Sequence, residues 1–195
     1  MTNTGDPASG FAQRVDAAIL ARAQGGDMQA FATLYSTFGR PCFNLALRIL
    51  GNRALAEDLV QEVFLKMFSS IRSYRGDAPF GSWLKRMTVN ATIDQLRSQR
   101  HDAETDSDAL LLLQPVADAA PAAVLDAWSL LQRLPARARA VLVLHEYEGY
   151  THAELAELFG QSESYSKSIL ARALRRLHDL IAPTAGTAYV RQHTE

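Results

Sequence analysis

The sequence has few of the features that mark a secreted, membrane-spanning or disulfide-bonded protein. It contains one cysteine, Cys42, which excludes an internal disulfide, and no uninterrupted apolar run approaches the ~20 residues that a membrane-spanning helix needs. No secretory signal is evident. We therefore expect a protein of the reducing cytoplasm, without a membrane span.

Motifs that carry enzyme chemistry are missing as well. The sequence shows neither a phosphate-cradling glycine loop nor a nucleophile motif. No metal-ligand spacing relates Cys42 to the histidines, which are His101, His145, His152, His178 and His193. We expect no cofactor, no metal and no enzymatic activity.

Charge is balanced overall but unevenly distributed. The formal net charge is −1, whereas residues 71–101 carry six lysines and arginines against two acids, and residues 102–126 carry six acids and no base. Such local blocks, rather than the sum, create the field that a partner experiences. The pattern favours a basic contact surface followed by an acidic segment; charges that only solvate helix faces are the alternative.

Helical periodicity, by contrast, is abundant. Apolar residues make up 48% of the chain, which is enough for real cores, and period-two alternation is scarce. The pattern predicts an all-α protein of two small helical domains joined by an acidic flexible linker. The predicted segments are a flexible arm at 1–14, a first domain at 15–100, the linker at 101–121, a second domain at 122–182 and a tail at 183–195.

In the first domain we expect helices over 15–24, 27–50, 54–70 and 82–100. Asp27, Asn52 and Ser82 are residue types that cap helix N-termini, and each stands near an expected helix start. The Gly39-Arg40-Pro41 segment is expected to bend or interrupt the second helix, because proline lacks the backbone N–H that a helix interior uses.

In the second domain the signals follow the order of a helix-turn-helix. After a helix over 122–133, another is predicted from Pro135 to about Tyr147. Thr151-His-Ala-Glu154 is a capping box that begins a short helix, which ends at Gly160. A longer helix then runs from Ser162 to about His178.

This last helix is amphipathic. Its apolar arc is expected to pack and comprises Ile169, Leu170, Ala173, Leu174, Leu177, Leu180 and Ile181. Arg172 and Arg175 on the opposite side can bond guanine edges or phosphates of DNA. That side comprises Ser164, Lys167, Ser168, Ala171, Arg172 and Arg175.

Three stretches carry the motifs of a known family. The first joins Asp27-Met-Gln-Ala-Phe31 to Ala54-Leu-Ala-Glu57-Asp58-Leu-Val-Gln61-Glu62-Val-Phe64, and the second is Trp83-Leu84 with Asn90, Asp94 and Arg97. The third is Leu134-Pro135, Arg139, Glu148-Gly149-Tyr150, Glu154-Leu-Ala156 and Lys167-Ser168 to Arg172-Ala173. In order and spacing they resemble the sigma-70 family of bacterial RNA polymerase subunits, in its small extracytoplasmic-function (ECF) form.

The resemblance implies that the helix over 54–70 docks on the core polymerase. Four polar residues of this helix are spaced i, i+1, i+4 and i+5 and therefore share one face: Glu57, Asp58, Gln61 and Glu62. Leu55, Leu59 and Val63 repeat every four residues on another face. A solvated acidic face is the alternative. The implied docking residues are Glu57, Asp58, Gln61, Glu62 and Phe64.

The resemblance also implies that residues 72–97 read and open the −10 element. Opening a duplex requires a pocket for an unstacked base and basic residues along the strand backbone. The implied residues are Arg72, Tyr74, Arg75, Trp83, Lys85, Arg86, Asn90, Asp94 and Arg97, with Phe80 among the aromatic side chains. A core position is the alternative for Trp83, and Asn90 and Asp94 are expected to shape the domain as much as to contact DNA.

The final helix corresponds to the family's −35 reader. The implied contacts are Ser164, Tyr165, Lys167, Ser168, Ala171, Arg172 and Arg175. The family usually has Gly-Thr-Val-Lys-Ser-Arg where this chain has Ser164-Tyr165-Ser166-Lys167-Ser168-Ile169. Tyr165 and Ser166 make the helix start more polar and Ile169 removes a common arginine, so the layout carries over and the preferred −35 sequence does not.

The resulting hypothesis is an ECF-type sigma factor that binds core RNA polymerase, recognises −10 and −35 promoter DNA and assists melting. The acidic linker either threads through the polymerase, as in the family, or acts as a solubilising tether. An anti-sigma factor is a partner that the resemblance alone implies. The alternatives are a conventional helix-turn-helix regulator that acts without being a polymerase subunit, and an interaction module that has lost DNA binding.

Overall fold

The chain forms two separate helical units in the computed structural model. The structure describes residues 10–101 and 127–181, so the expected tail, nearly all of the expected linker and most of the expected arm lie outside the described residues. Helices joined by turns and short loops make up the described ranges, which contain no strand. Contacts divide the chain into Met1–Glu104 and Thr105–Glu195. The prediction of an all-α protein with two helical domains is confirmed.

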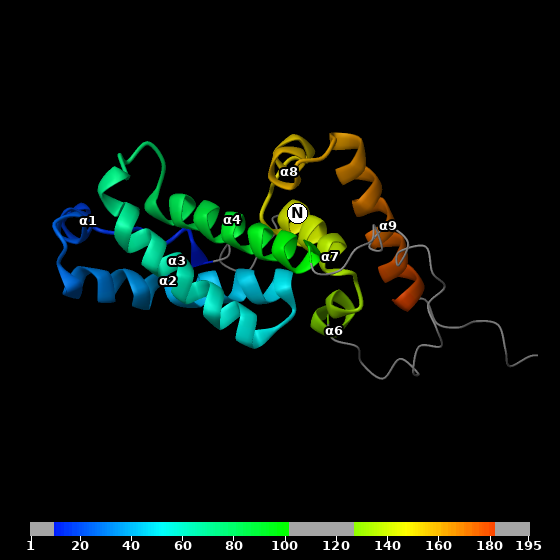
Figure 1. Cartoon of the computed structure of the whole chain (residues 1–195), viewed down its shortest axis with the longest axis horizontal. Coiled ribbons are helices and arrows are strands. Elements are labelled where there is room, and N and C mark those ends of the chain that lie inside the picture. Colours follow the sequence, from blue (N-terminus) through cyan, green and yellow to red (C-terminus); the bar gives the residue numbers. More distant parts are fainter. Residues whose placement is uncertain (1–9, 102–126, 182–195) are drawn as a thin grey trace, which may run out of the picture. The chain divides into compact units, whose positions relative to one another are not determined.

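The first unit is built around its longest helix, α2 (Figure 1). This helix contacts α1, α3 and α4, and α3 and α4 also contact one another. The elements are α1 (Ala17–Gln24), α2 (Met28–Leu50), α3 (Arg53–Ser70), the 3-10 helix η2 (Ile71–Ser73) and α4 (Phe80–His101).

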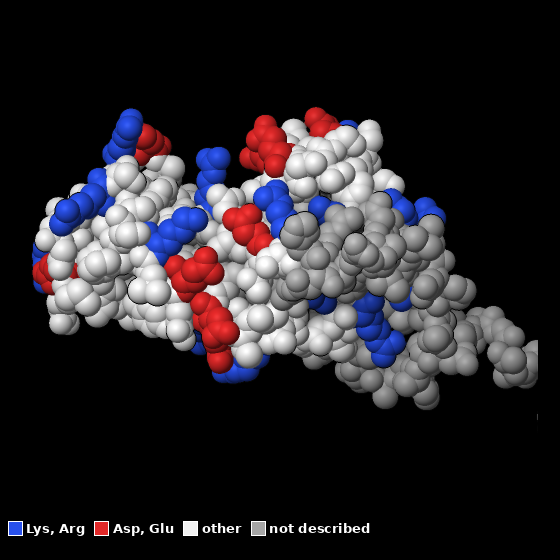
Figure 2. Space-filling model, in the orientation of Figure 1, with Lys and Arg blue, Asp and Glu red and all other residues white. Residues whose placement is uncertain are grey.

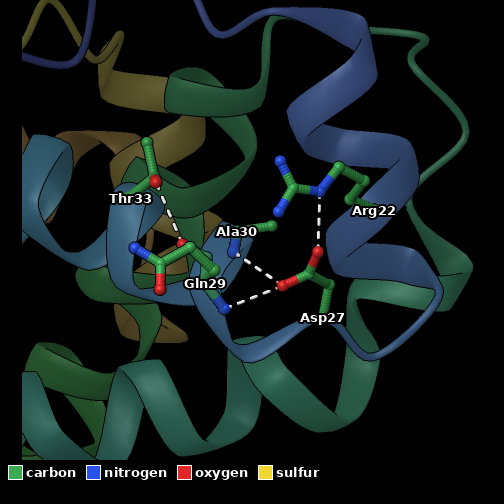
Figure 3. Close-up of polar contacts among 5 residues, drawn as sticks. All are labelled: Arg22, Asp27, Gln29, Ala30 and Thr33. Carbon is green, nitrogen blue, oxygen red and sulfur yellow. Dashed lines mark hydrogen bonds and ion pairs between the residues drawn. The ribbon is translucent and has the colours of Figure 1, made fainter.

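Short polar side chains begin the helices of this unit. The Asp27 carboxylate accepts hydrogen bonds from the backbone N–H groups of Gln29 (2.8 Å) and Ala30 (3.3 Å), and Arg22 donates to it at 2.6 Å (Figure 3). These bonds satisfy donors that have no partner within the helix. Asn52 caps α3 in the same way through the N–H of Leu55. Both caps were predicted and are confirmed.

The structure corrects two predictions for this unit: Ser82 does not cap α4, and Pro41 does not interrupt α2. Ser82 lies inside α4, which already begins at Phe80, and its backbone N–H donates to the carbonyl of Pro79. α2 runs unbroken through Pro41, whose ring is buried. Packing against neighbouring helices outweighs the single hydrogen bond that a proline removes.

One face of α2 supplies the core of the first unit. Leu34, Phe38, Leu45 and Ile49 are each at most 1% exposed. Cys42 is fully buried on the same face, and burial raises the pKa of its thiol to about 12. A thiol held in its protonated form is a small apolar core residue rather than a reactive group.

The start of α4 lies against the described part of the arm. Phe11 is 4% exposed and stacks on Phe38 at 6.4 Å between ring centroids. A Cβ added at Gly81 would lie 1.9 Å from the Phe11 carbonyl oxygen. The two backbones therefore approach so closely that only glycine fits, and Phe11 belongs to the core rather than to a loose arm.

The loop that leads into α4 is fixed at its beginning. The Gln24 side-chain amide, from the end of α1, donates to the backbone carbonyls of Ile71 (3.3 Å) and Tyr74 (2.9 Å). The Tyr74 hydroxyl in turn donates to the carbonyl of Ala78 at 2.6 Å. These bonds hold both the backbone and the ring of Tyr74.

In the second unit, α9 contacts both α7 and α8. The elements are α6 (Ala127–Gln132), α7 (Ala136–Leu142), the π-helical turn η3 (Val143–Tyr147), α8 (His152–Phe159) and α9 (Glu163–Ile181). Pro135 is the N-cap of α7, one residue before the position expected for it. The predicted capping box is present: Thr151 Oγ1 accepts from the N–H of Glu154 at 3.2 Å, and the Glu154 carboxylate accepts from the N–H of Thr151 at 2.8 Å.

The turn between α8 and α9 has the geometry of the predicted helix-turn-helix. Gly160 ends α8 in the left-handed region, with φ of 61°. That conformation costs little for glycine and reverses the chain direction within a few residues. Ser162 then caps α9, since its hydroxyl accepts from the N–H of Tyr165 at 3.1 Å. Within residues 10–101 and 127–181, no helix is long and apolar enough to cross a membrane.

The packed side of α9 is narrower than its apolar pattern indicates. Ile169, Leu170, Ala173 and Leu180 are buried, but Leu174 is 46% and Ile181 61% exposed. At 100° per residue the two exposed side chains lie together at one edge of the predicted arc. The expectation that they pack is therefore wrong for the unit described by itself.

Candidate functional site

The outward face of α3 carries the predicted polar side chains. Glu57, Asp58, Gln61 and Glu62 are all exposed, whereas Leu59 and Val63 are buried against the bundle. Acidic groups gather over α3 in the space-filling view (Figure 2). Arg53 pairs with Glu57 at 2.8 Å, so the acidic character is concentrated beyond the first turn.

Apolar side chains continue this face toward the C-terminal end of α3. Phe64 itself is 8% exposed because the Tyr35 ring lies edge-on to it at 4.7 Å. Tyr35 (52%), Leu65 (72%) and Phe68 (47%) are exposed instead, and Phe68 contacts Phe31 at 4.4 Å. The sequence analysis missed these residues, although Leu65 and Phe68 fall within the same 140° arc as the acidic residues at 100° per residue.

Three aromatic rings meet where the loop joins α4. The Tyr74 centroid lies 5.5 Å from Phe80 and 5.4 Å from Trp83, and Phe80 and Trp83 are 5.6 Å apart. Phe80 is buried, while Tyr74 and Trp83 are half-buried. Tyr74 and Trp83 therefore keep part of each ring exposed, whereas the Phe80 ring is covered. Trp83 both packs within the domain and contributes to its surface.

Basic residues precede and follow this cluster along the chain. Arg72, Arg75 and Arg86 are exposed and Lys85 is half-buried. Further along α4, the exposed residues Asn90, Asp94 and Arg97 lie on the side that also carries Trp83 and Arg86, because their spacings of three and four residues return to one helix face. Asp94 pairs with Arg97 at 3.1 Å. Five of the predicted −10 residues thus share one side of α4, whereas Lys85, two residues after Trp83, lies on the opposite side of the helix and does not join them.

The outer side of α9 is small, polar and basic. Ser164, Lys167, Ser168, Ala171 and Arg175 are exposed. Arg172 is half-buried, and its guanidinium donates to the Ser168 hydroxyl (2.9 Å) and carbonyl (3.2 Å). Lys167 pairs with Glu163 at 3.3 Å. Small side chains between the basic ones leave room for a partner to approach the helix backbone.

Ser166 does not belong to this outer side. It is 2% exposed, and its hydroxyl is hydrogen-bonded to Nδ1 of His152 at 3.0 Å. The His152 ring stacks on His145 at 4.4 Å, and Nδ1 of His145 donates to the carbonyl of Tyr150 at 2.7 Å. On a helical wheel, Ser166 falls in the middle of the apolar arc of α9, and this position predicts a buried side chain. The prediction that Ser166 belongs to the polar first turn of the helix did not use that signal.

Comparison with known proteins covers both units. Residues 34–101 match the model of sigma-70 region 2, and residues 125–177 match that of sigma-70 region 4. The ECF RNA polymerase sigma factor SigM of Mycobacterium tuberculosis is 35% identical over 181 residues, which span 90% of each chain. The ECF sigma factor BldN of Streptomyces coelicolor is 29% identical over 175 residues, covering 86% of this chain and 66% of that protein.

This chain belongs to the sigma-70 family, in its ECF class. The fold agrees: the chain is similar to the sigma factor RpoE of Bartonella quintana, solved with the anti-sigma factor NepR, with a TM-score of 0.51 over 77% of this chain and 95% of that one, at 24% identity. The matched regions contain the surfaces described above. Region 2 of this sigma factor includes the α3 face and α4, and region 4 includes α8 and most of α9.

Two histidines of this sigma factor, His145 and His152, serve packing in the region 4 unit. His145 and His152 are both half-buried, and each uses Nδ1 within the protein. Across the described residues, no group of three or more His, Cys, Asp or Glu side chains is arranged to hold a metal ion. Burial lowers the pKa of His152, and the nearby His145 and Lys167 lower it further.

Proposed function

We propose that this sigma factor binds core RNA polymerase through the α3 face, reads the −35 element with α9 and helps to open the −10 region with α4 and its preceding loop. The observation that carries the proposal is that each matched sigma-70 region presents a surface that suits the role proposed for it. Region 2 presents an acidic and apolar face beside an aromatic and basic one, and region 4 presents a basic helix face.

The α3 face suits a protein partner better than it suits DNA. Its carboxylates would repel phosphates, so the partner is expected to carry basic side chains. Leu65 and Phe68 supply the apolar contact area that a stable protein interface needs, and aromatic residues are enriched at such interfaces. Docking would use Glu57, Asp58, Gln61 and Glu62 together with these two, while Phe64 supports Tyr35 from below.

The aromatic cluster at the start of α4 suits an unstacked base. A flipped or single-stranded base gains stacking energy on an aromatic ring, and basic residues follow its backbone. Tyr74 and Trp83 offer partly open rings, and Arg72, Arg75 and Arg86, close to them along the chain, are exposed. Asn90, Asp94 and Arg97 extend this surface along α4 toward the adjoining DNA.

The outer side of α9 suits the major groove of duplex DNA. A helix of this kind contacts base edges from its first turns and phosphates from its basic residues. Ser164, Lys167, Ser168 and Ala171 offer small or flexible contacts there, and Arg172 and Arg175 offer bidentate ones. Tyr165 lies in the first turn of α9, and because it is half-buried, only part of its side chain would be open to contact DNA.

Neither reader is expected to bind DNA tightly alone. Each presents few contacts, and we propose that the polymerase sets the spacing of the two readers. Docking on the polymerase would fix that spacing and raise the effective concentration of the second contact once the first has formed. The free protein would therefore bind promoter DNA poorly.

The same proposal places the protein among regulatory subunits rather than enzymes, with the cytoplasm as its site of action. An anti-sigma factor is a proposed partner, supported by the complex in which the similar RpoE fold was solved. No metal or other cofactor has a role in this proposal.

Transcription in vitro tests the proposal directly. Core enzyme, the purified chain and genomic promoter fragments are combined, and promoter-specific transcripts are mapped. We expect discrete start sites that depend on this chain, and co-purification of the chain with core enzyme. Absence of both would overturn the proposal.

A gel shift separates this function from that of a conventional helix-turn-helix regulator, which the family membership does not favour. A regulator of that kind would shift operator DNA tightly as free protein, whereas this sigma factor is expected to need the core enzyme. Arg172→Ala with Arg175→Ala should weaken promoter binding by the holoenzyme about tenfold or more. Unchanged binding would indicate an interaction module without DNA contacts.

A further inference from the structure

Three helices of the second unit meet at one arginine. Arg137 is the second residue of α7, and its guanidinium carbon lies 5.4 Å from the ring centroid of Phe159 and 5.5 Å from that of Tyr165. Phe159 is the last residue of α8, and Tyr165 lies in the first turn of α9. One planar cation thus contacts both rings across the turn of the helix-turn-helix.

This contact is favourable and directional. The face of an aromatic ring attracts a cation within about 6 Å, and the guanidinium stacks on rings in a way that a lysine ammonium does not reproduce. Arg137 and Tyr165 are half-buried and Phe159 is 5% exposed, so water screens the attraction less than on an open surface.

The contact acts on the part of α9 that is least held by the core. The fully buried residues of α9, Ile169 and Ala173, lie one turn or more beyond Tyr165. Before them, the helix is attached through Ser166 to His152 and through Tyr165 to Arg137. Ser164, Lys167 and Ser168, three of the proposed −35 contacts, flank these two attachments along the chain.

We propose that Arg137 is a positioning residue for recognition of the −35 element, holding the first turn of α9 in register through the ring of Tyr165. The inference rests on the proposed function of α9. Arg137 acts through Tyr165, so its removal should loosen the placement of Ser164, Lys167 and Ser168 rather than unfold the unit. The core built from Leu144, Leu155, Ile169 and Ala173 remains without it.

The test uses full-length protein assembled with core enzyme on two templates, one with the natural −35 element and one with that element scrambled. Arg137→Ala is expected to raise the promoter concentration needed for half-maximal transcription about tenfold on the natural template, and to leave the scrambled template unaffected. The rate at saturating promoter and the thermal midpoint should stay close to those of the wild type. Arg133→Ala, which removes one positive charge from the same unit, is the matched control and should change neither template.

Paired substitutions show whether the effect passes through Tyr165. Arg137→Ala should have its full effect when Tyr165 is replaced by Phe, which keeps the ring, and no further effect when Tyr165 is replaced by Ala. Arg137→Lys should restore only part of the affinity, because an ammonium cannot stack on both rings.

Three results would overturn the inference: equal loss on both templates, an effect of Arg137→Ala that persists in the Tyr165→Ala background, or loss of the unit's thermal transition. Failure of the proposed function is a separate result, because the wild-type holoenzyme would then show no dependence on the −35 element at all.

Discussion

The α3 face of the first unit and the α9 face of the second differ in what holds them in place. α3 packs on α2 and α4 through apolar side chains of its own, of which Leu59, Val63 and Met67 are at most 3% exposed. α9 starts on polar and charged contacts, namely the bond between His152 and Ser166 and the stacking of Arg137 on Tyr165. The first surface is therefore fixed by packing, and the second depends on hydrogen bonds and charge at the N-terminal end of α9.

The largest expected effect is a loss of core-polymerase binding through the α3 face, with the α9 face left unchanged. Reversing Asp58 and Glu62 to Lys should weaken binding to core polymerase about 100-fold, because like charges brought together at an interface cost several kcal/mol. Surface plasmon resonance with immobilised core enzyme measures the change. Glu157→Lys with Asp179→Lys, which reverses two exposed acids of the second unit, is the control and should bind normally. Equal binding by both variants would remove α3 as the docking face.

A single methyl group tests the claim that packing holds the first unit. Gly81→Ala should lower the free energy of unfolding by about 1–3 kcal/mol, because the added Cβ would lie 1.9 Å from the Phe11 carbonyl oxygen and α4 would have to shift. Gly39→Ala is the matched control, since its Cβ meets Tyr35 at an ordinary 3.6 Å within a helix. Urea denaturation gives both values. Two indistinguishable variants would show that the close approach does not constrain the fold.

The claim that polar contacts hold the second unit is tested at the capping box of α8. Thr151→Ala should destabilise the second unit by about 1 kcal/mol, because the backbone N–H of Glu154 loses its acceptor and the Glu154 carboxylate loses the hydrogen bond from the Thr151 hydroxyl. Thr151→Ser keeps the hydroxyl and should recover most of the loss. Hydrogen exchange of the α8 amides reports the change at the site itself. Full protection in Thr151→Ala would mean that water or packing replaces the cap.

The smallest expected effect is a pH dependence confined to the second unit. Burial lowers the pKa of His152; the nearby His145 and Lys167 lower it further, while Glu163 and Glu146 oppose them. The folded state therefore binds fewer protons than the unfolded chain, so stability falls as pH drops below the ordinary histidine pKa of about 6.5.

Thermal unfolding between pH 7.5 and 5.5 measures this dependence. His152→Asn should flatten the profile, whereas His178→Asn, an exposed histidine of α9, should leave it unchanged. A profile that is equally steep in wild type and His152→Asn would assign the proton uptake to another group.

Local signals in the sequence predicted a large part of this structure. The caps at Asp27, Asn52 and Thr151 act within three residues, so the sequence alone reveals them. Amphipathic spacing likewise predicted the exposed face of α3 and most of the packed side of α9.

The features that the sequence did not predict depend on contacts between residues that are distant along the chain. The helical wheel could have predicted the burial of Ser166, but not the partner of its hydroxyl, because His152 lies fourteen residues earlier. Ser82 does not cap α4 because that helix already starts at Phe80, which packs on Phe38. The ring of Tyr165 is half-buried and meets an arginine from another helix, a contact that the sequence did not predict. No helical wheel or capping rule contains that kind of information.

The bonds made by Gln24 have a consequence for how a strand would be captured. Because its amide holds the backbone at Ile71 and Tyr74, and Tyr74 holds Ala78, the loop before α4 is ordered during folding rather than on contact with DNA. An incoming base would then meet rings already in position, and its binding would not have to offset the conformational entropy of ordering that loop. Such preorganisation favours fast capture of a base during a brief opening of the duplex, and it would couple the end of α1 to the rate of promoter melting.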